Sequence, residues 1–380
     1  MSRTPTANRR GLLKTAAIGA AAASAGSLAM PQVSRAQTVT LRFQSTWPQR
    51  DIFHEFAGDY VKRVNDMAGG RLRIELLAAG AVVGAFQLLD AVSSGSLDGG
   101  HGVSAYWFGK NKAFSLFGTA PPWFGDANQF LGWFYHGGGE ALYNELIGDI
   151  LKVNVVGFQT GPMPTQPLGW FKNPIERPEQ LRGLKYRTVG LAADLFNELG
   201  AAVVSLPGGE IVPALERGVL DGAEFNNPSS DRVLGFPDVA KVYMIQSFHQ
   251  KTESFEVVFN KTKFETLSVE QKAIIRHASE AASADMSWKL QDRYSKDLAE
   301  MQATQGVRVV TTPRPVLEAQ LRAWDAVITK YEGDNSSPAN GPFFKKVCDS
   351  QRAWCRRVSN FTLRYEASPV LAFNHFFARG

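Results

Sequence analysis

Three polar side chains lie at the ends of short apolar stretches that have the pattern of buried strands. Gln166 precedes a predicted strand at 168–171, whereas Arg187 and Glu224 end predicted strands at 184–187 and 221–224. Ligands of open α/β sheets bind outside the carboxyl ends of the strands. We therefore expect these three side chains to converge on one binding site.

The residue types at these three positions indicate the chemistry of the predicted site. An arginine at position 187 would hold a carboxylate by a planar, two-pronged pair of hydrogen bonds, which lysine does not provide. Glu224 would then be an anion facing an anionic ligand, unless a hard cation with oxygen ligands lies between them and also uses Gln166. The competing interpretation of Arg187 is a solvated arginine at a strand end.

The elements that must position these side chains alternate between strands and helices, the order of an α/β protein. Apolar residues alternate with polar ones at 39–43, the pattern of a half-buried strand, and recur at helical spacing from Phe53 to Val64. Further elements are predicted as strands at 72–76, 97–100, 153–159, 202–205 and 255–260, and as helices at 86–92, 191–199 and 210–217.

The chain is long enough for two lobes, because a single core stops growing efficiently at about 250–300 residues. Gly161-Pro162-Met163-Pro164 is read as a rigid break and as the crossing into the second lobe. The predicted lobes are residues 37–160 with 250–380, and residues 161–249. Ser268 and Gln271 form a capping box that opens a helix predicted to run to about 305 and to span both lobes, and a second helix is predicted at 315–331.

The basic charge of the chain is concentrated at its start. The formal net charge is +5, from 41 basic and 36 acidic residues, but residues 1–36 hold five basic residues and no acidic one, so the remainder is balanced. That balance argues against a nucleic-acid partner. Residues 1–36 have the layout of an export signal, with Arg9-Arg10 resembling the twin-arginine motif and small residues Ser34 and Ala36 before the cleavage point. These features predict a periplasmic protein, with a membrane anchor as the alternative.

Several motifs with other chemistry are incomplete. Gly100-His101-Gly102-Val103-Ser104-Ala105 fits a loose dinucleotide fingerprint, but no helix pattern or suitably spaced acid follows it. The six histidines are scattered without metal-ligand spacing. Cys348 and Cys355, seven residues apart, would form a disulfide only if a helix broke between them, so a bridge and free thiols both stay open.

With these residues in place, the chain resembles the periplasmic solute-binding proteins of tripartite ATP-independent (TRAP) transporters, in particular the branch that binds 2-oxoacids and related hydroxy acids. The resemblance covers nearly the whole chain after the signal. The segments that carry it include Gly69-Gly70-Arg71-Leu72-Arg73-Ile74, Gln166-Pro167-Leu168-Gly169-Trp170-Phe171, Gly183-Leu184-Lys185-Tyr186-Arg187 and Leu206-Pro207-Gly208-Gly209-Glu210-Ile211.

The resemblance implies a non-enzymatic, two-lobed clamp that captures a small organic acid for the membrane subunits of a TRAP transporter, often as a homodimer. It implies that Arg187 pairs with the substrate carboxylate and that Tyr106 hydrogen-bonds across the cleft, although Tyr106 also fits a core position. It further implies a sodium or calcium ion that bridges to the substrate and is held by Gln166, Glu224 and the backbone carbonyl of Phe225.

The sequence departs from the pattern of this branch next to the predicted site. Phe225 replaces the usual tryptophan, and Asn226-Asn227-Pro228-Ser229 replaces a more apolar run. We therefore include Asn226 among the predicted substrate-binding residues and expect a longer or more hydroxylated acid than pyruvate. Two alternatives stay open, an exported enzyme that acts on an organic acid and the binding protein of an ATP-driven importer.

Overall fold

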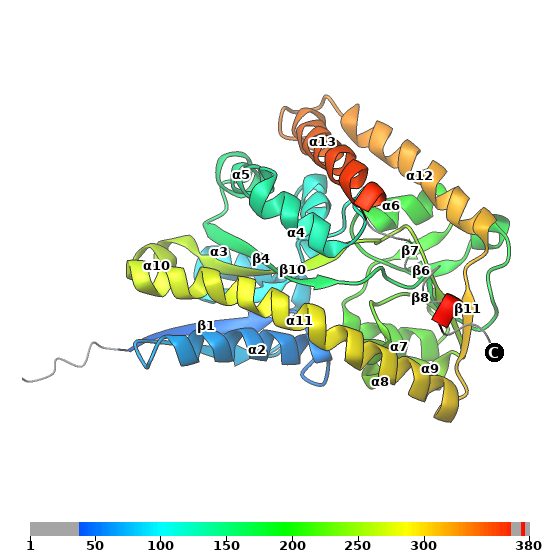
Figure 1. Ribbon diagram of the computed structural model, residues 1–380, viewed down its shortest axis with the longest axis horizontal. Coiled ribbons are helices and arrows are strands. Elements are labelled where there is room, and N and C mark those ends of the chain that lie inside the picture. The colour runs from blue at the N-terminus through cyan, green and yellow to red at the C-terminus, as the bar shows by residue number, and fades with distance from the viewer. Residues whose placement is uncertain (1–37, 366–373, 377–380) are drawn as a thin grey trace, which may run out of the picture. The chain divides into compact units, whose positions relative to one another are not determined.

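Two β-sheets organise the chain in the computed structural model, which describes residues 38–365 and 374–376 (Figure 1). The described residues from Val39 onward belong to one compact unit, and the predicted export signal at 1–36 lies outside the described residues. In the described ranges, no helix combines the length and the apolar character needed to cross a membrane.

The first sheet has five strands, in the spatial order β2, β1, β3, β10, β4. Strands β2 and β3 pair with β1 in parallel, whereas β10 is antiparallel to both β3 and β4. Their bounds are β1 (Val39–Ser45), β2 (Leu72–Leu77), β3 (Gly99–Gly102), β4 (Val155–Met163) and β10 (Glu253–Asn260).

The second sheet has six strands, in the spatial order β11, β9, β5, β8, β6, β7. Strand β5 is antiparallel to both neighbours, and the other pairs are parallel. The bounds are β5 (Gly169–Phe171), β6 (Lys185–Arg187), β7 (Ala202–Val204), β8 (Gly222–Ala223), β9 (Val242–Ile245) and β11 (Arg308–Thr311).

Helices follow most strands, as the alternating pattern predicted. The α-helices are α2 (Ile52–Met67), α3 (Leu88–Ser94), α4 (Ala127–His136), α5 (Gly139–Asn144), α6 (Leu191–Glu198), α7 (Gly208–Glu216), α8 (Pro228–Leu234), α9 (Phe236–Val239), α10 (Lys261–Glu265), α11 (Val269–Thr304), α12 (Arg314–Glu332) and α13 (Gly341–Tyr365). Short 3₁₀ helices include η1 (Ala85–Gln87), η2 (Ser104–Trp107) and η3 (Lys112–Phe117).

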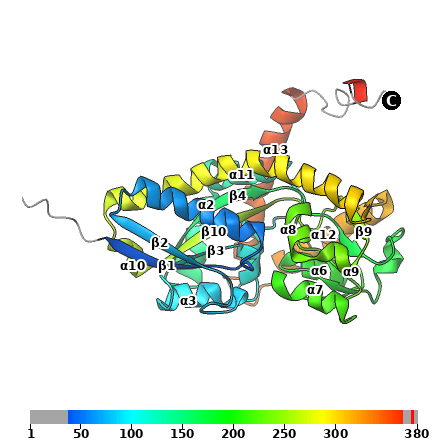
Figure 2. The ribbon, with the colours of Figure 1, turned by 90° about the horizontal axis from the view of Figure 1, so that it is seen from below.

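Helix α11 is the long helix predicted from the capping box. The Ser268 side chain accepts a hydrogen bond from the Gln271 backbone, and the Gln271 side chain accepts one from the Ser268 backbone. The helix packs on α2 and β4 beside the first sheet and on α8 beside the second (Figures 1 and 2). It therefore braces elements of both sheets.

The chain passes from the first sheet to the second after Met163, near the predicted crossing, but Gly161-Pro162-Met163 continues a strand and does not break it. Strand β4 continues to Met163, and its pairing with β10 shifts register around Gly161. Gly161 has φ +56°, the left-handed region that glycine tolerates. A β-bulge also accommodates a proline such as Pro162, which has no N–H to donate.

One strand and one helix in the C-terminal part differ from the sequence-based prediction. Residues 250–380 were placed in the first lobe, but β11 pairs with β9 in the second sheet. The predicted lobe boundaries otherwise stay a prediction. Helix α13 was not predicted, and it runs unbroken through Cys348 and Cys355, which are both buried and free. Burial raises the pKa of the Cys355 thiol to about 12, so this thiol stays protonated and unreactive.

Gly99, Gly100 and Gly102 serve packing at the centre of the first sheet. Strand β3 lies between β1 and β10, and a Cβ atom on Gly100 would lie 2.6 Å from Leu88 Cδ2. Helix α3 therefore packs closely against this strand. The loose dinucleotide fingerprint is explained by this close approach.

Candidate functional site

The Arg187 and Glu224 side chains meet at the carboxyl ends of two parallel strands. Strands β6 and β8 are neighbours in register, with Arg187 opposite Ala223, so Glu224 follows directly beyond the pair. Arg187 Nη1 lies 2.9 Å from Glu224 Oε1 and donates a second bond of 2.9 Å to the Glu224 carbonyl. The predicted convergence of these two residues is thus present in the structure.

This ion pair is withdrawn from solvent. The side chains of Arg187 and Glu224 are 1% and 0% exposed, which excludes the interpretation of Arg187 as a solvated residue. Arg187 Nε also donates to the Leu206 carbonyl at 2.9 Å. Two carbonyls and one carboxylate therefore hold the guanidinium in a fixed orientation, as a pre-formed anion site requires.

The Arg187 guanidinium offsets only part of the effect of burial on the Glu224 carboxylate. Burial raises the pKa of this carboxyl to about 7, although the Arg187 guanidinium acts in the opposite direction. Its Oε2 atom is buried and has no hydrogen-bond partner. A buried carboxylate oxygen without a partner costs free energy, so this oxygen is available to a further group, such as a cation.

Gln166 belongs to the same site through Glu253, which the sequence analysis did not identify. Gln166 Nε2 donates to Glu253 Oε2, and Asn226 Nδ2 donates to the same oxygen at 2.9 Å. The Gln166 Oε1 atom is buried without a partner. Burial, together with the charge of Glu224, raises the pKa of Glu253 to about 8.

Phe225 contributes its side chain to the core. Its ring lies 5.6 Å from that of Phe53, and the Arg187 guanidinium carbon lies 5.8 Å from the ring centroid. With the ring packed in this way, a role in ion binding falls to its backbone carbonyl. That role stays a prediction.

Tyr106, on η2, has the packing of a core aromatic, and its predicted hydrogen bond across the cleft stays a prediction. Its ring packs edge to face against Phe86 with centroids 4.8 Å apart. The charges of Arg187, Glu253 and Glu224 all act on its hydroxyl, and burial raises the pKa of that hydroxyl above its usual value. It also lines a cavity of about 320 Å³ with Val189 and Ser205, which flank the strands of the second sheet.

The run after Phe225 is largely occupied by its own hydrogen bonds. Asn227 Oδ1 caps α8 by accepting from the backbone N–H groups of Ser229 and Ser230. Asn227 Nδ2 donates to Asn226 Oδ1 at 3.0 Å. Both asparagine side chains thus have structural partners, whereas the buried Ser229 hydroxyl in the same run has none.

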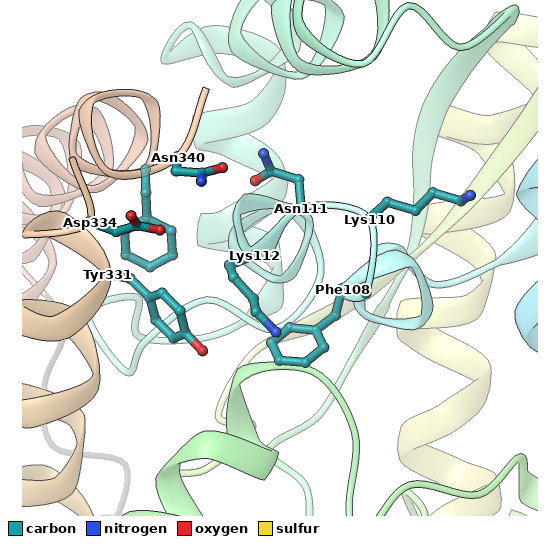
Figure 3. A pocket seen from close by; sticks show the side chains of 9 residues that line it. Phe108, Lys110, Asn111, Lys112, Tyr331, Asp334 and Asn340 are labelled. Carbon is teal, nitrogen blue, oxygen red and sulfur yellow. The ribbon is translucent and has the colours of Figure 1, made fainter. Parts of the chain in front are cut away.

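A second cavity, of about 190 Å³, lies between the segment 108–112 and the end of α12 with the segment that follows it (Figure 3). The Lys112 ammonium lies 3.4 Å from the centroid of the Phe108 ring. None of the predicted site residues lines this cavity. The candidate site is therefore the buried cluster around Arg187 and not this cavity.

Two residues near Gln166 were missed by the sequence analysis. Glu253 begins β10, and both side-chain amide atoms of Gln250 are buried without partners. The backbone carbonyl of Gln250 accepts a hydrogen bond from the Gln166 N–H at 3.1 Å. A detectable signal was Glu253 and Glu256 within or beside a strand predicted as buried, because buried carboxylates need partners.

The residues present fit a cation with oxygen ligands. No group of three or more His, Cys, Asp or Glu side chains suited to a metal occurs in the described ranges. The predicted set instead combines one carboxylate with a side-chain amide and a backbone carbonyl. Glu224 Oε2 and Gln166 Oε1 are buried oxygens without partners, and sodium or calcium accepts such donors.

Known proteins of one class match this chain over most of its length. The sequence model of DctP, the bacterial extracellular solute-binding proteins of family 7, matches residues 43–334. The chain belongs to this family. It is 35% identical to the monocarboxylate 2-oxoacid-binding periplasmic protein of Nostoc sp. over 282 residues, which are 73% of this chain and 76% of the relative.

Solved structures of DctP-type proteins share the fold. A TRAP transporter solute-binding protein from Bordetella bronchiseptica, a mixed-occupancy dimer with calcium and picolinate, superposes with a TM-score of 0.82 at 27% identity and covers 90% of this chain and 98% of its own. A TRAP protein from Colwellia psychrerythraea with calcium and pyruvate gives 0.81 at 28% identity, covering 90% and 100%. One from Pseudoalteromonas atlantica with sodium and pyruvate gives 0.80 at 27% identity, with the same coverage.

These matches confirm the family and the two-lobed α/β fold that the sequence predicted. DctP proteins of TRAP transporters are solute-binding receptors and not enzymes. The alternative of an exported enzyme is therefore set aside, and so is that of an ATP-driven importer.

Proposed function

We propose that this DctP protein captures a small 2-oxo or 2-hydroxy monocarboxylate together with a bridging sodium or calcium ion. The buried Arg187–Glu224 pair, with its unpartnered Glu224 oxygen, is the observation that carries the proposal. Arg187 would hold the carboxylate, and Glu224, Gln166 and the Phe225 carbonyl would hold the ion. Tyr106 would approach the ligand from the side of the first sheet.

The ligands of similar proteins support this assignment. The relative from Nostoc sp. is a monocarboxylate 2-oxoacid-binding protein. The structural neighbours contain picolinate or pyruvate together with calcium or sodium. The structural partners of Asn226 and Asn227 leave the buried Ser229 hydroxyl as the free polar group of this run, which favours a simple acid over the more hydroxylated one expected from the sequence. In this proposal the protein works in the periplasm after twin-arginine export and, as a homodimer, delivers its ligand to TRAP membrane subunits.

A thermal-shift screen tests the proposal. The purified protein, first stripped of ligand, is heated with pyruvate, lactate and longer 2-oxoacids, each with and without calcium or sodium. A ligand that binds only the folded protein stabilises it by about 2.7 kcal/mol at one hundred times its Kd. We expect a large shift with one of these acids that depends on the cation. Absence of any shift would refute the proposed ligand class.

The variant Arg187→Lys tests the role of the arginine. Lysine keeps the positive charge but loses the two-pronged geometry, so we expect carboxylate affinity to fall at least tenfold, about 1.4 kcal/mol, in titration calorimetry. Arg276→Lys is a matched control, because Arg276 makes a two-pronged pair with Glu140 on the more exposed face of α11. Unchanged affinity in Arg187→Lys would contradict the assigned role.

A further inference from the structure

Glu253 occupies a central position between two predicted site residues. It is the first residue of β10 and is 3% exposed. A single carboxylate oxygen, Oε2, accepts hydrogen bonds from Gln166 Nε2 and Asn226 Nδ2. Gln166 precedes β5 of the second sheet, whereas Glu253 belongs to the first, so this contact links the two sheets at the site.

The chemistry of these groups determines which way the Gln166 side chain faces. The Glu253 Oε2 atom accepts two hydrogen bonds and so carries no proton itself, whereas a side-chain amide has one donating and one accepting end. The amide nitrogen of Gln166 therefore faces Glu253, and its oxygen faces away. That oxygen, Oε1, is buried and without a partner, as expected of a ligand atom that is oriented before its cation binds.

We propose that Glu253 is a positioning residue of the cation site, which acts by turning the Gln166 carbonyl oxygen toward the ion. In this role Glu253 itself does not coordinate the ion or the substrate. The inference rests on the proposed function, because it assumes that Gln166 is a cation ligand. It predicts that the Glu253 acceptor oxygen, more than the Glu253 charge, governs cation affinity.

Glu256 on the same strand provides a matched control. It is also fully buried, and its carboxylate accepts hydrogen bonds from Ser104 and Tyr143, both at 2.7 Å, and from Trp107. Residues three apart in a strand point to opposite faces of the sheet. Replacing Glu256 thus removes a buried, hydrogen-bonded carboxylate without touching Gln166.

The experiment compares Glu253→Met, Glu253→Gln and Glu256→Met with the wild-type protein. The Kd of pyruvate is measured by titration calorimetry with and without calcium chloride, or sodium chloride if the wild type responds to sodium. The ratio of the two Kd values is the cation–substrate coupling, which is reciprocal between the two ligands. Melting temperatures of the ligand-free variants report structural damage separately.

We expect Glu253→Met to lower this coupling at least tenfold. Glu253→Gln should keep it within threefold, because its amide oxygen still accepts from Gln166, and Glu256→Met should keep it even though the variant melts earlier. Unchanged coupling in Glu253→Met would overturn the inference. So would an equal loss in Glu253→Met and Glu253→Gln, which would mean that charge decides, or an equal loss in Glu256→Met, which would mean general damage.

A crystal structure of the wild-type protein with calcium and pyruvate tests the inference without any variant. It should show Gln166 Oε1 on the ion and Nε2 on Glu253. Direct coordination of the ion by Glu253 would overturn the positioning role. If the wild type binds none of the tested acids, the proposed function itself fails. If the wild type binds an acid with cation dependence, and substitution of Glu253 leaves that dependence unchanged, only this inference is refuted.

Discussion

Four buried carboxyl groups shape the electrostatics around Arg187 at the scale of single residues. Burial is the largest cause that raises the pKa of Asp51 and Glu224 to about 7, and of Asp231 and Glu253 to about 8. Each group therefore keeps its proton to a higher pH than an exposed carboxyl does. A bound cation would favour the charged form of a carboxylate beside it.

Asp51 allows this effect to be measured apart from the proposed ion ligands. Its Oδ1 atom accepts from the Phe53 N–H at 3.2 Å and from Ser230 Oγ at 2.6 Å, while Oδ2 is buried without a partner. Asparagine at this position keeps the Oδ1 acceptor and is an equally good N-cap for α2. The substitution Asp51→Asn thus removes the ionisable group and little else.

Burial raises the folded-state pKa of Asp51 from its ordinary value of 3.8 to about 7, so the folded protein holds this proton more tightly than the unfolded chain. Its contribution to stability is therefore full below about pH 4 and is lost as the pH rises to about 7. We expect Asp51→Asn to reduce the fall in unfolding free energy between pH 5 and pH 8 by about 1 kcal/mol or more. Urea unfolding of the ligand-free proteins measures this, and an unchanged pH dependence would contradict the prediction.

At the scale of elements, helix α11 is the long helix that packs beside both sheets. It has 36 residues and at 1.5 Å per residue extends about 54 Å. Buried residues such as Ile275 and Met286 recur along it. Gln271 also donates to the Arg71 carbonyl at 2.9 Å, which attaches the start of the helix to the entrance of β2. The first turn of α11 is thus stabilised by its cap and by a tertiary contact.

Loss of the cap should destabilise the protein without changing the site. We expect Ser268→Ala to lower the unfolding free energy by about 1 kcal/mol, because an N-cap hydrogen bond is lost. Denaturant unfolding measures the change. Ser295→Ala, an exposed serine on the same helix, should change stability by less than about 0.5 kcal/mol, and equal effects of the two changes would argue against a specific capping role.

At the scale of the whole molecule, hydrogen bonds join elements that pack beside different sheets. Ser230 on α8 donates to Asp51 at the start of α2, and Arg50 Nη2 donates to the Leu234 carbonyl at 2.8 Å. A clamp that closes on its ligand gains affinity from every contact made only in the closed state. We therefore expect these contacts to contribute to ligand affinity without touching the ligand, provided that they form on closure.

Arg50→Ala tests this indirect contribution. Removal of one partly exposed hydrogen bond costs about 0.5–1 kcal/mol, so we expect the Kd of the captured acid to rise about two- to fivefold. Titration calorimetry measures it, with Arg42→Ala, an exposed arginine on β1, as the control. An unchanged Kd in Arg50→Ala would mean that this contact does not distinguish the closed from the open state.

The sequence by itself determined the α/β alternation, the capped long helix, and the convergence of Arg187 and Glu224 on one site, because hydrophobic period, capping residues and strand-end positions are local signals. Only the tertiary structure decided that β11 pairs in the second sheet, that β4 continues past Pro162, and that Glu253 contacts Gln166. Strand pairing and bulges depend on partners far away in the chain. Gln166 and Glu253 are 87 residues apart, and no local pattern specifies that contact.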